Sequence, residues 1–177
     1  MKVALSPLEF ARRARRLYAK NEAVVDGDLR FTYEEFLSRC DQWSNALQKM
    51  GVEKGDKVAY IAPNTHSHLE AYYAVPQTGA VLVPINYRLS ADEFEYIINH
   101  SESKIVCVHP DYYDSVDNVR EKLTAVEHFV ALEGEKDGWS EYEQLILGIE
   151  ANYEPVDIDE DDLITINYTS GTTARPK

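Results

Sequence analysis

The residues best suited to chemistry lie in the stretch LITINYTSGTTARPK, residues 163–177. An apolar run from Leu163 to Ile166 leads into residues rich in hydroxyl groups: Thr169, Ser170, Gly171, Thr172 and Thr173. Where a buried strand ends in such a loop, backbone N–H groups and hydroxyl groups lie close together. Such a group of hydrogen-bond donors can bind the oxygens of a polyphosphate. Lys177 adds a positive charge on a flexible side chain. The pattern predicts a phosphate-binding loop after a strand.

Two other interpretations of this stretch are a P-loop and a plain surface turn. The P-loop of kinases and ATPases follows the pattern G-x-x-x-x-G-K-[ST]. That pattern is absent, because Gly171 is the only glycine of the stretch and Pro176 precedes the lysine. A Ser/Thr-rich surface turn after a strand remains the alternative if the hydroxyl-bearing residues are taken alone. Ser170 lacks the G-x-S-x-G setting of a hydrolase nucleophile, which favours a phosphate contact for its hydroxyl.

The order of residues from Tyr168 to Lys177, YTSGTTARPK, resembles the phosphate-binding signature of the AMP-forming adenylating enzymes. That superfamily includes acyl- and aryl-CoA synthetases, firefly luciferase and peptide-synthetase adenylation domains. Three upstream stretches are similar to the acyl-CoA synthetase branch, namely AVVDGDLRFTYEEF at 23–36, GDKVAYIAPN at 55–64 and GAVLVPINYRLSADEFEYII at 79–98. The resemblance therefore covers nearly the whole chain.

The resemblance implies a two-step reaction. A carboxylate attacks the α-phosphate of Mg·ATP to give an acyl-adenylate and pyrophosphate, and coenzyme A then takes the acyl group. The resemblance also assigns roles to residues of the loop. Thr169 would contact Mg²⁺, Lys177 would supply a catalytic positive charge, and the residues that bind the nucleotide phosphates would be Thr169, Ser170, Gly171, Thr172, Thr173, Ala174 and Lys177.

Ala174 departs from the family pattern, which usually has glycine at this position. Glycine allows positive φ and a close approach of the backbone to phosphate, whereas a methyl group there costs on the order of 1 kcal/mol. We hypothesise that Ala174 weakens nucleotide binding without changing the fold.

The resemblance further indicates an incomplete enzyme. The family's motifs for adenine, ribose, the metal-binding carboxylate and the catalytic lysine of a small C-terminal domain are missing from the sequence. We expect the N-terminal fragment of a carboxylate–CoA ligase for fatty or related acids, inactive by itself. Residues 1–52 would contribute helices and a hairpin to a neighbouring subdomain, and residues 53–177 would form an α/β subdomain that ends in the loop. The alternative is a non-catalytic remnant or interaction domain that keeps the fold.

Composition limits the partners of this chain. It has 177 residues, 44% of them hydrophobic, and a net charge of −13, which makes nucleic acid or an anionic membrane an unfavourable partner. No apolar run is long enough to span a membrane, and the two cysteines, Cys40 and Cys107, indicate a reduced cytoplasmic setting. We expect a sheet edge and part of a core to be uncovered, and therefore a homo-oligomer or association with the missing remainder.

The elements that must position the loop alternate between strand and helix. Apolar strand candidates, several of them continuous in Val, Ile, Leu and Ala, are 58–62, 80–85, 104–108, 128–132 and 163–168. Helical stretches between them are 66–77, 91–101, 111–124 and 140–147, with capping boxes at Ser90/Glu93 and Ser140/Glu143. This alternation predicts an α/β fold, layered as αβαβα, with a mostly parallel sheet. Ligands of such sheets gather beyond the carboxyl ends of the strands, where the loop would lie.

The N-terminal part reads as a helix over 7–20, a hairpin around Asp26-Gly27, and a helix that begins at a Thr32/Glu35 capping box. In the first helix the apolar positions Phe10, Ala14 and Leu17 are expected to face the core and the arginines to face solvent. Residues 149–162, which are rich in acidic side chains, are the best candidate for a linker. His66 and His68 are two residues apart, hence poor joint metal ligands, and are expected at the surface or in caps.

Overall fold

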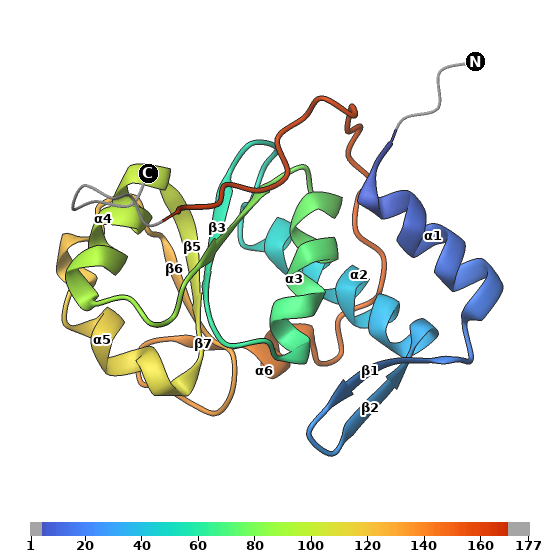
Figure 1. Cartoon of the computed structure of the whole chain (residues 1–177), viewed down its shortest axis with the longest axis horizontal. Helices are drawn as coiled ribbons and strands as arrows, with labels where there is room; N and C mark the ends of the chain where they lie inside the picture. Colours follow the sequence, from blue (N-terminus) through green and yellow to red (C-terminus); the bar gives the residue numbers. More distant parts are fainter. Residues whose placement is uncertain (1–4, 170–177) are drawn as a thin grey trace.

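A five-stranded parallel sheet organises the molecule (Figure 1). The computed structural model describes residues 5–169. The strands follow the order β4-β3-β5-β6-β7 and comprise Lys57–Ile61 (β3), Val81–Ile85 (β4), Ser103–Val108 (β5), His128–Ala131 (β6) and Ser140–Glu141 (β7). Every pair in this sheet is parallel, as the predicted α/β class requires.

Two hydrophobic layers cover the two faces of the sheet. Successive side chains of β3 alternate between them, because a strand presents neighbouring residues to opposite faces. Val58 and Tyr60 face the layer that contains α2 (Tyr33–Lys49), α3 (His66–Gln77) and α6 (Tyr142–Ile146). Ala59 and Ile61 face the layer that contains α4 (Ala91–Ser101) and α5 (Tyr113–Asp117). Both sides of the central strands are therefore buried, which explains their continuous apolar sequences.

Two predicted helices differ from the structure. The stretch 111–124 forms two short 3₁₀ turns, Pro110–Tyr112 (η1) and Arg120–Lys122 (η2), around the five-residue α5. The apolar residues of this stretch are buried as a helical stripe would be. The stretch does not form one long helix because its Asp, Asn and β-branched Val residues have low helix propensity. The predicted box at Ser140/Glu143 is also wrong. Ser140 belongs to β7, and the side chain of Glu141 accepts hydrogen bonds from the N–H groups of Glu143 and Gln144 instead.

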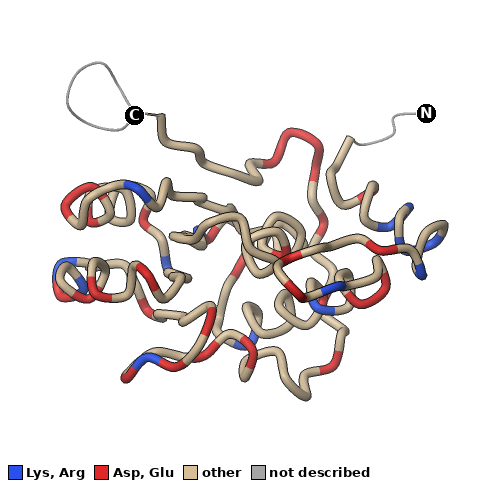
Figure 2. Tube along the Cα trace, turned by 60° about the horizontal axis from the view of Figure 1, so that its bottom comes forward, with Lys and Arg blue, Asp and Glu red and all other residues tan. Residues whose placement is uncertain are grey.

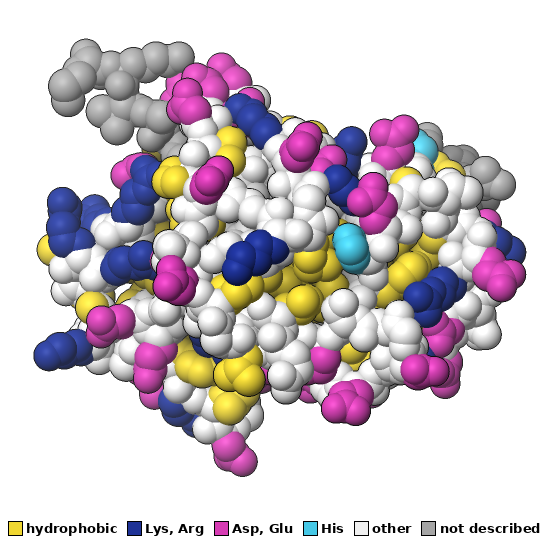
Figure 3. Space-filling view, turned by 180° about the vertical axis from the view of Figure 1, so that it is seen from behind, with side chains coloured by type: hydrophobic (Ala, Val, Ile, Leu, Met, Phe, Trp, Pro, Cys, Tyr) yellow, Lys and Arg dark blue, Asp and Glu magenta, His cyan; other side chains and the backbone are white. Residues whose placement is uncertain are grey.

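The N-terminal part contains α1 (Pro7–Tyr18), the hairpin of β1 (Glu22–Asp26) and β2 (Leu29–Thr32), and α2. The hairpin turns at Gly27 with φ of +54°, and the predicted box of Thr32 and Glu35 is present at the start of α2. In α1 the arginines are exposed as expected, but the predicted core positions are wrong, because Phe10 and Leu17 are 66% and 52% exposed and Leu8 is the buried residue of the helix. Basic side chains gather at the same end of the molecule (Figure 3).

The predicted linker over 149–162 runs along the molecule rather than away from it. Side chains of α2 hold its backbone: Asn45 donates to the carbonyl of Glu150 and Gln48 to that of Glu154, at 2.9 and 2.8 Å. Lys54 donates to the carbonyl of Asp157. The acidic residues of this segment form a band at its outer turn (Figure 2).

Within residues 5–169, none of the helices combines the length and the apolar character that crossing a membrane requires.

Candidate functional site

The carboxyl ends of the parallel strands meet at one edge of the sheet. β3 is followed by Pro63 and Asn64, β5 by His109 and β6 by Leu132 and Glu133. The backbone ties these ends together, since the N–H of His109 donates to the carbonyl of Ile61 at 2.9 Å. This edge is where an open α/β sheet binds its ligands.

The segment 163–169 lies beside β4 and pairs with it near the beginning of that strand. Thr165 forms a parallel bridge with Leu82, in which the Leu82 N–H donates to Ile164 and the Leu82 carbonyl accepts from Ile166, both at 2.9 Å. The predicted strand over 163–168 is therefore reduced to a single bridge. Leu163 is 58% exposed, so its run lacks the two-sided burial that makes the inner strands continuous.

Of the residues predicted to bind phosphate, Thr169 is described and is exposed at the end of this segment. The others lie outside the described residues, namely Ser170, Gly171, Thr172, Thr173, Ala174 and Lys177. The structure therefore gives a position for Thr169, the first residue of the loop. The phosphate, metal and catalytic roles of the loop residues stay predictions.

Tyr168 anchors the beginning of the loop through its side chain. Its hydroxyl lies 2.7 Å from Nδ1 of His100 in the last turn of α4, and the two rings meet edge to face with centroids 5.7 Å apart. Burial, followed by the neighbouring Tyr96, raises the pKa of the Tyr168 phenol. The sequence alone does not mark His100 as a site residue, because its partner lies 68 positions away along the chain.

A second polar cluster lies between the hairpin, α2, α3 and α6. Arg39 donates from Nε to Glu70 at 2.6 Å and from a terminal nitrogen to Glu143 at 2.6 Å, while its guanidinium lies over the Phe31 ring. The Tyr142 hydroxyl also donates to Glu70, which is fully buried. The sequence carried one signal of this cluster. Glu70 is the one acidic residue of α3.

His66 joins this cluster to the hairpin. Its Nδ1 and its backbone N–H both lie 2.8 Å from Asp26, and Nε2 lies 3.5 Å from Glu143. Burial opposes the imidazolium, but the hydrogen bonds to Glu143 and Asp26 outweigh that effect and raise the pKa of His66. His68 stacks between the rings of Tyr60 and Tyr72. Both histidines are buried, contrary to the expected surface positions.

The charges of the cluster are satisfied internally. Burial favours the neutral form of Glu143, yet His66 and Arg39 reverse this and lower its pKa to about 2. Burial raises the pKa of Glu70 despite the opposing contacts with Arg39 and Tyr142. A carboxylate with so low a pKa is a weak general base at neutral pH, so Glu143 fits a structural role. Among residues 5–169, no group of three or more His, Cys, Asp or Glu is arranged to hold a metal ion.

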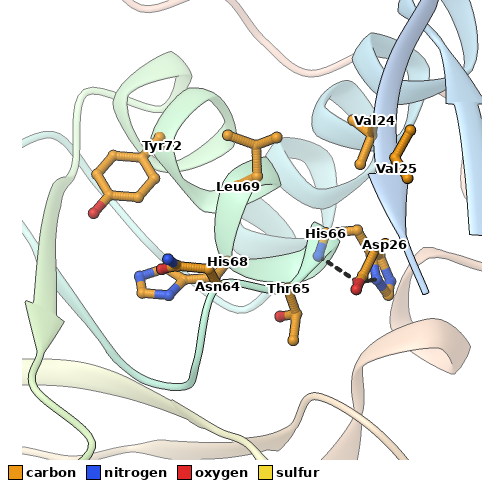
Figure 4. Close-up of a pocket in the computed structure, with 9 residues that line it drawn as sticks. All are labelled: Val24, Val25, Asp26, Asn64, Thr65, His66, His68, Leu69 and Tyr72. Atoms are coloured by element: carbon orange, nitrogen blue, oxygen red, sulfur yellow. Dashed lines mark hydrogen bonds and ion pairs between the residues drawn. The ribbon is translucent and has the colours of Figure 1, made fainter.

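Two cavities adjoin this cluster. The smaller, of about 200 Å³, lies between the hairpin and the start of α3, and Figure 4 shows His68, Leu69 and Tyr72 along it with Asp26 bonded to His66 at one end. The larger, of about 660 Å³, has apolar walls at Leu29, Phe31 and Leu132 and acidic ones at Glu133 and Glu141.

The two cysteines contribute no nucleophile here, because both are buried and burial raises their thiol pKa values.

Comparison with known proteins identifies relatives of the chain. A model of the family described as AMP-binding enzyme matches residues 10–177. The long-chain-fatty-acid–CoA ligase of Thermus thermophilus is 40% identical over 96% of this chain and 32% of its own length. The 4-hydroxybutyrate–CoA ligase 2 of Metallosphaera sedula is 37% identical over 98% of this chain and 33% of its own length.

Solved structures agree on the fold. The anthranilate CoA ligase AuaEII in complex with anthranoyl-AMP superposes with a TM-score of 0.94 and 24% identity, over 99% of this chain and 34% of that one. The chain thus spans about a third of the length of the proteins it matches. The family match extends over nearly the whole chain, and it includes the loop predicted from the sequence. This protein therefore belongs to the AMP-binding enzyme family.

Proposed function

We propose that this chain is the N-terminal part of an AMP-forming carboxylate–CoA ligase. The complete enzyme would activate a fatty or related carboxylic acid with Mg·ATP to an acyl-adenylate and then transfer the acyl group to coenzyme A. One observation carries the proposal. The family match over residues 10–177 includes the whole YTSGTTARPK sequence, and the segment that leads into it pairs with the sheet through the bridge between Leu82 and Thr165. Named CoA ligases among the relatives support the same reaction class.

The loop would act on the leaving end of the nucleotide. Backbone N–H and hydroxyl groups of Thr169, Ser170, Gly171, Thr172 and Thr173 would hold the β- and γ-phosphates, so preorganised donors would meet the charge that develops on pyrophosphate. Lys177 would add a positive charge, and Thr169 would contact Mg²⁺. A chain with a net charge of −13 repels the anionic nucleotide, so positive charges close to the phosphates are needed to bind it. Repulsion from distant acidic groups is limited, because salt screens charges beyond about 8–10 Å.

A triple substitution tests the role of the loop. Thr172, Thr173 and Lys177 are replaced by alanine in a full-length ligase that carries this chain as its N-terminal part. We expect ATP affinity and the rate of adenylate formation to fall by at least tenfold, since several phosphate contacts are lost together. The matched control replaces the exposed Thr124 and Lys49 by alanine. Equal affinity and equal adenylate formation in the triple variant and its parent would refute the proposal.

Ala174 offers a test in the opposite direction. Restoring the family's glycine by Ala174→Gly in the same full-length context should strengthen ATP binding by about fivefold, the equivalent of roughly 1 kcal/mol. Isothermal titration with a non-hydrolysable ATP analogue measures the change. If Ala174→Gly leaves both affinity and turnover unchanged, alanine is as good as glycine at this position.

We also propose that the 177 residues alone do not catalyse the reaction. Carboxylate-dependent ATP–pyrophosphate exchange by the purified chain is expected to equal the no-protein control. Exchange above that control would overturn this part of the proposal. The second candidate is a non-catalytic remnant or interaction domain, which the exposed apolar residues Phe10 and Leu17 of α1 favour. Coding sequence that continues in frame beyond Lys177 with the remaining motifs supports the enzyme, and a stop codon without a separately encoded partner supports the remnant.

A further inference from the structure

The contact between His100 and Tyr168 joins α4 to the residue that precedes the loop. The backbone of the segment is paired with Leu82 through Ile164 and Ile166. Tyr168 lies two residues further on, where its ring packs into the hydrophobic layer of α4 and α5. The direct side-chain contact of 2.7 Å with His100 then fixes the hydroxyl end of that ring.

The position of His100 suits such an anchor. It lies in the last turn of α4, whose body is fixed to the sheet by the buried residues Phe94, Ile97 and Ile98. The ring of His100 is itself in contact with Tyr96, at a centroid distance of 5.4 Å. A rigid helix therefore presents the imidazole, and the imidazole holds the phenol. Thr169, whose backbone begins the phosphate loop, is covalently the next residue.

We propose that His100 is a positioning residue for nucleotide binding, which acts by holding Tyr168 and thereby the first residue of the phosphate loop. The inference rests on the proposed function for its ligand, the phosphates of ATP. The anchor itself is a property of described residues and can be tested separately. We expect the Tyr168 hydroxyl to donate to Nδ1 of His100, which corresponds to the tautomer with the ring proton on Nε2.

A double-mutant cycle on the 177-residue chain tests the anchor. The variants are His100→Ala, Tyr168→Phe and the combination of both, and the readout is amide hydrogen exchange by NMR at Ile166, whose N–H donates to the carbonyl of Leu82. We expect each single variant to accelerate exchange roughly threefold to tenfold, the effect of one lost hydrogen bond. The double variant should add little to either single one, because both remove the same contact. Additive effects, or unchanged exchange, would overturn the proposal.

Two further readouts separate positioning from a general loss of structure. In the parent chain the ¹⁵N shift of His100 should indicate an Nδ1 that accepts a hydrogen bond, and Tyr168→Phe should abolish that signature. His100→Asn places a polar atom near the position of Nδ1 and is expected to restore most of the slow exchange. Matched controls are Tyr87→Phe, a half-buried tyrosine of the same hydrophobic layer, and His128→Ala. An effect of the controls as large as that of the anchor variants would refute a specific role of His100.

Titration with magnesium pyrophosphate distinguishes the anchor from the proposed function. Where the parent chain binds pyrophosphate, His100→Ala and Tyr168→Phe should weaken binding by roughly threefold to tenfold and His100→Asn should restore it. Unchanged affinity in all variants would refute the role of His100 in nucleotide binding. If the parent does not bind pyrophosphate, the loop has no phosphate role in this chain, and the role of His100 in nucleotide binding is refuted with it. The double-mutant cycle on hydrogen exchange would still decide whether His100 holds Tyr168.

Discussion

Arg39 is the cation on which the buried carboxylate of Glu70 depends. Replacing Arg39 by methionine keeps much of the side-chain volume but leaves Glu70 without its charged partner. An uncompensated buried charge is strongly destabilising, so we expect the free energy of unfolding to fall by about 3–5 kcal/mol in urea denaturation. The control is Arg12→Met, which removes an exposed pair with Glu9 and should change stability by less than about 1 kcal/mol. Equal losses in the two variants would contradict this account.

His66 should make the stability of the chain depend on pH. Its pKa is raised in the folded state, where hydrogen bonds to Glu143 and Asp26 outweigh burial. The stabilisation is therefore complete below the unfolded pKa of about 6.5 and is lost as pH rises through the folded pKa. Glu143 and Asp26 have lowered pKa values and stay charged across this range.

The measurement compares the parent with His66→Gln by urea denaturation between about pH 5.5 and 8.5, a range that includes the ordinary histidine pKa. We expect the stability advantage of the parent to shrink as pH rises, because the folded imidazolium loses its proton. His128→Gln serves as the control for a histidine at the opposite end of the strands. A constant advantage across the range would show that the charge of His66 does not stabilise the fold.

At the scale of elements, Gly79 connects α3 to β4 at a position where a side chain would be crowded by its neighbours. Its φ is +74°, and a Cβ there would lie 3.0 Å from side-chain atoms of both Lys54 and Val156. Gly51 has a similar φ of +81° but open space around it. We expect Gly51→Ala to lower the free energy of unfolding by about 1 kcal/mol and Gly79→Ala by about 1–3 kcal/mol more. Equal losses in thermal or urea unfolding would mean that the neighbours of Gly79 move freely.

Elements specified by local residues were predictable from the sequence. The hairpin follows from Asp26-Gly27 because glycine allows the turn, and the start of α4 follows from the Ser90/Glu93 capping box. Elements that depend on distant partners were not. The stretch 111–124 has the apolar stripe of a helix, yet contacts such as that of Asp117 with Trp139 stabilise it as separate turns.

The candidate site shows the same division. The loop sequence could be recognised from motif order, whereas its position at the carboxyl edge of the sheet stays a prediction, because the described part of the segment contacts the beginning of β4 and the last turn of α4. The anchor between His100 and Tyr168, and the cluster of Arg39, Glu70 and Glu143, join residues 31 to 104 positions apart. These contacts depend on how the helices pack against one another. The spacing of apolar residues in one helix indicates its buried face but not the residues that this face will meet.

At the scale of the whole molecule, charge is unevenly distributed. The chain is strongly acidic, yet α1 carries Arg12, Arg13, Arg15 and Arg16 beside the exposed apolar residues Phe10 and Leu17. Exposed apolar groups with a basic rim complement the acidic surface of a second copy of the same chain. We therefore predict that the isolated chain self-associates through α1, with an affinity that falls as salt is added.

Sedimentation velocity over a range of protein concentrations tests this prediction. The variant Phe10→Lys/Leu17→Lys should shift the chain to the monomer without loss of stability, because neither side chain is buried. The control Val25→Lys/Leu147→Lys makes the same change of charge at two other exposed apolar residues and should retain the association. A parent that is monomeric at all concentrations would refute self-association. A control that dissociates as fully as the α1 variant would show that net charge, rather than the surface of α1, governs it.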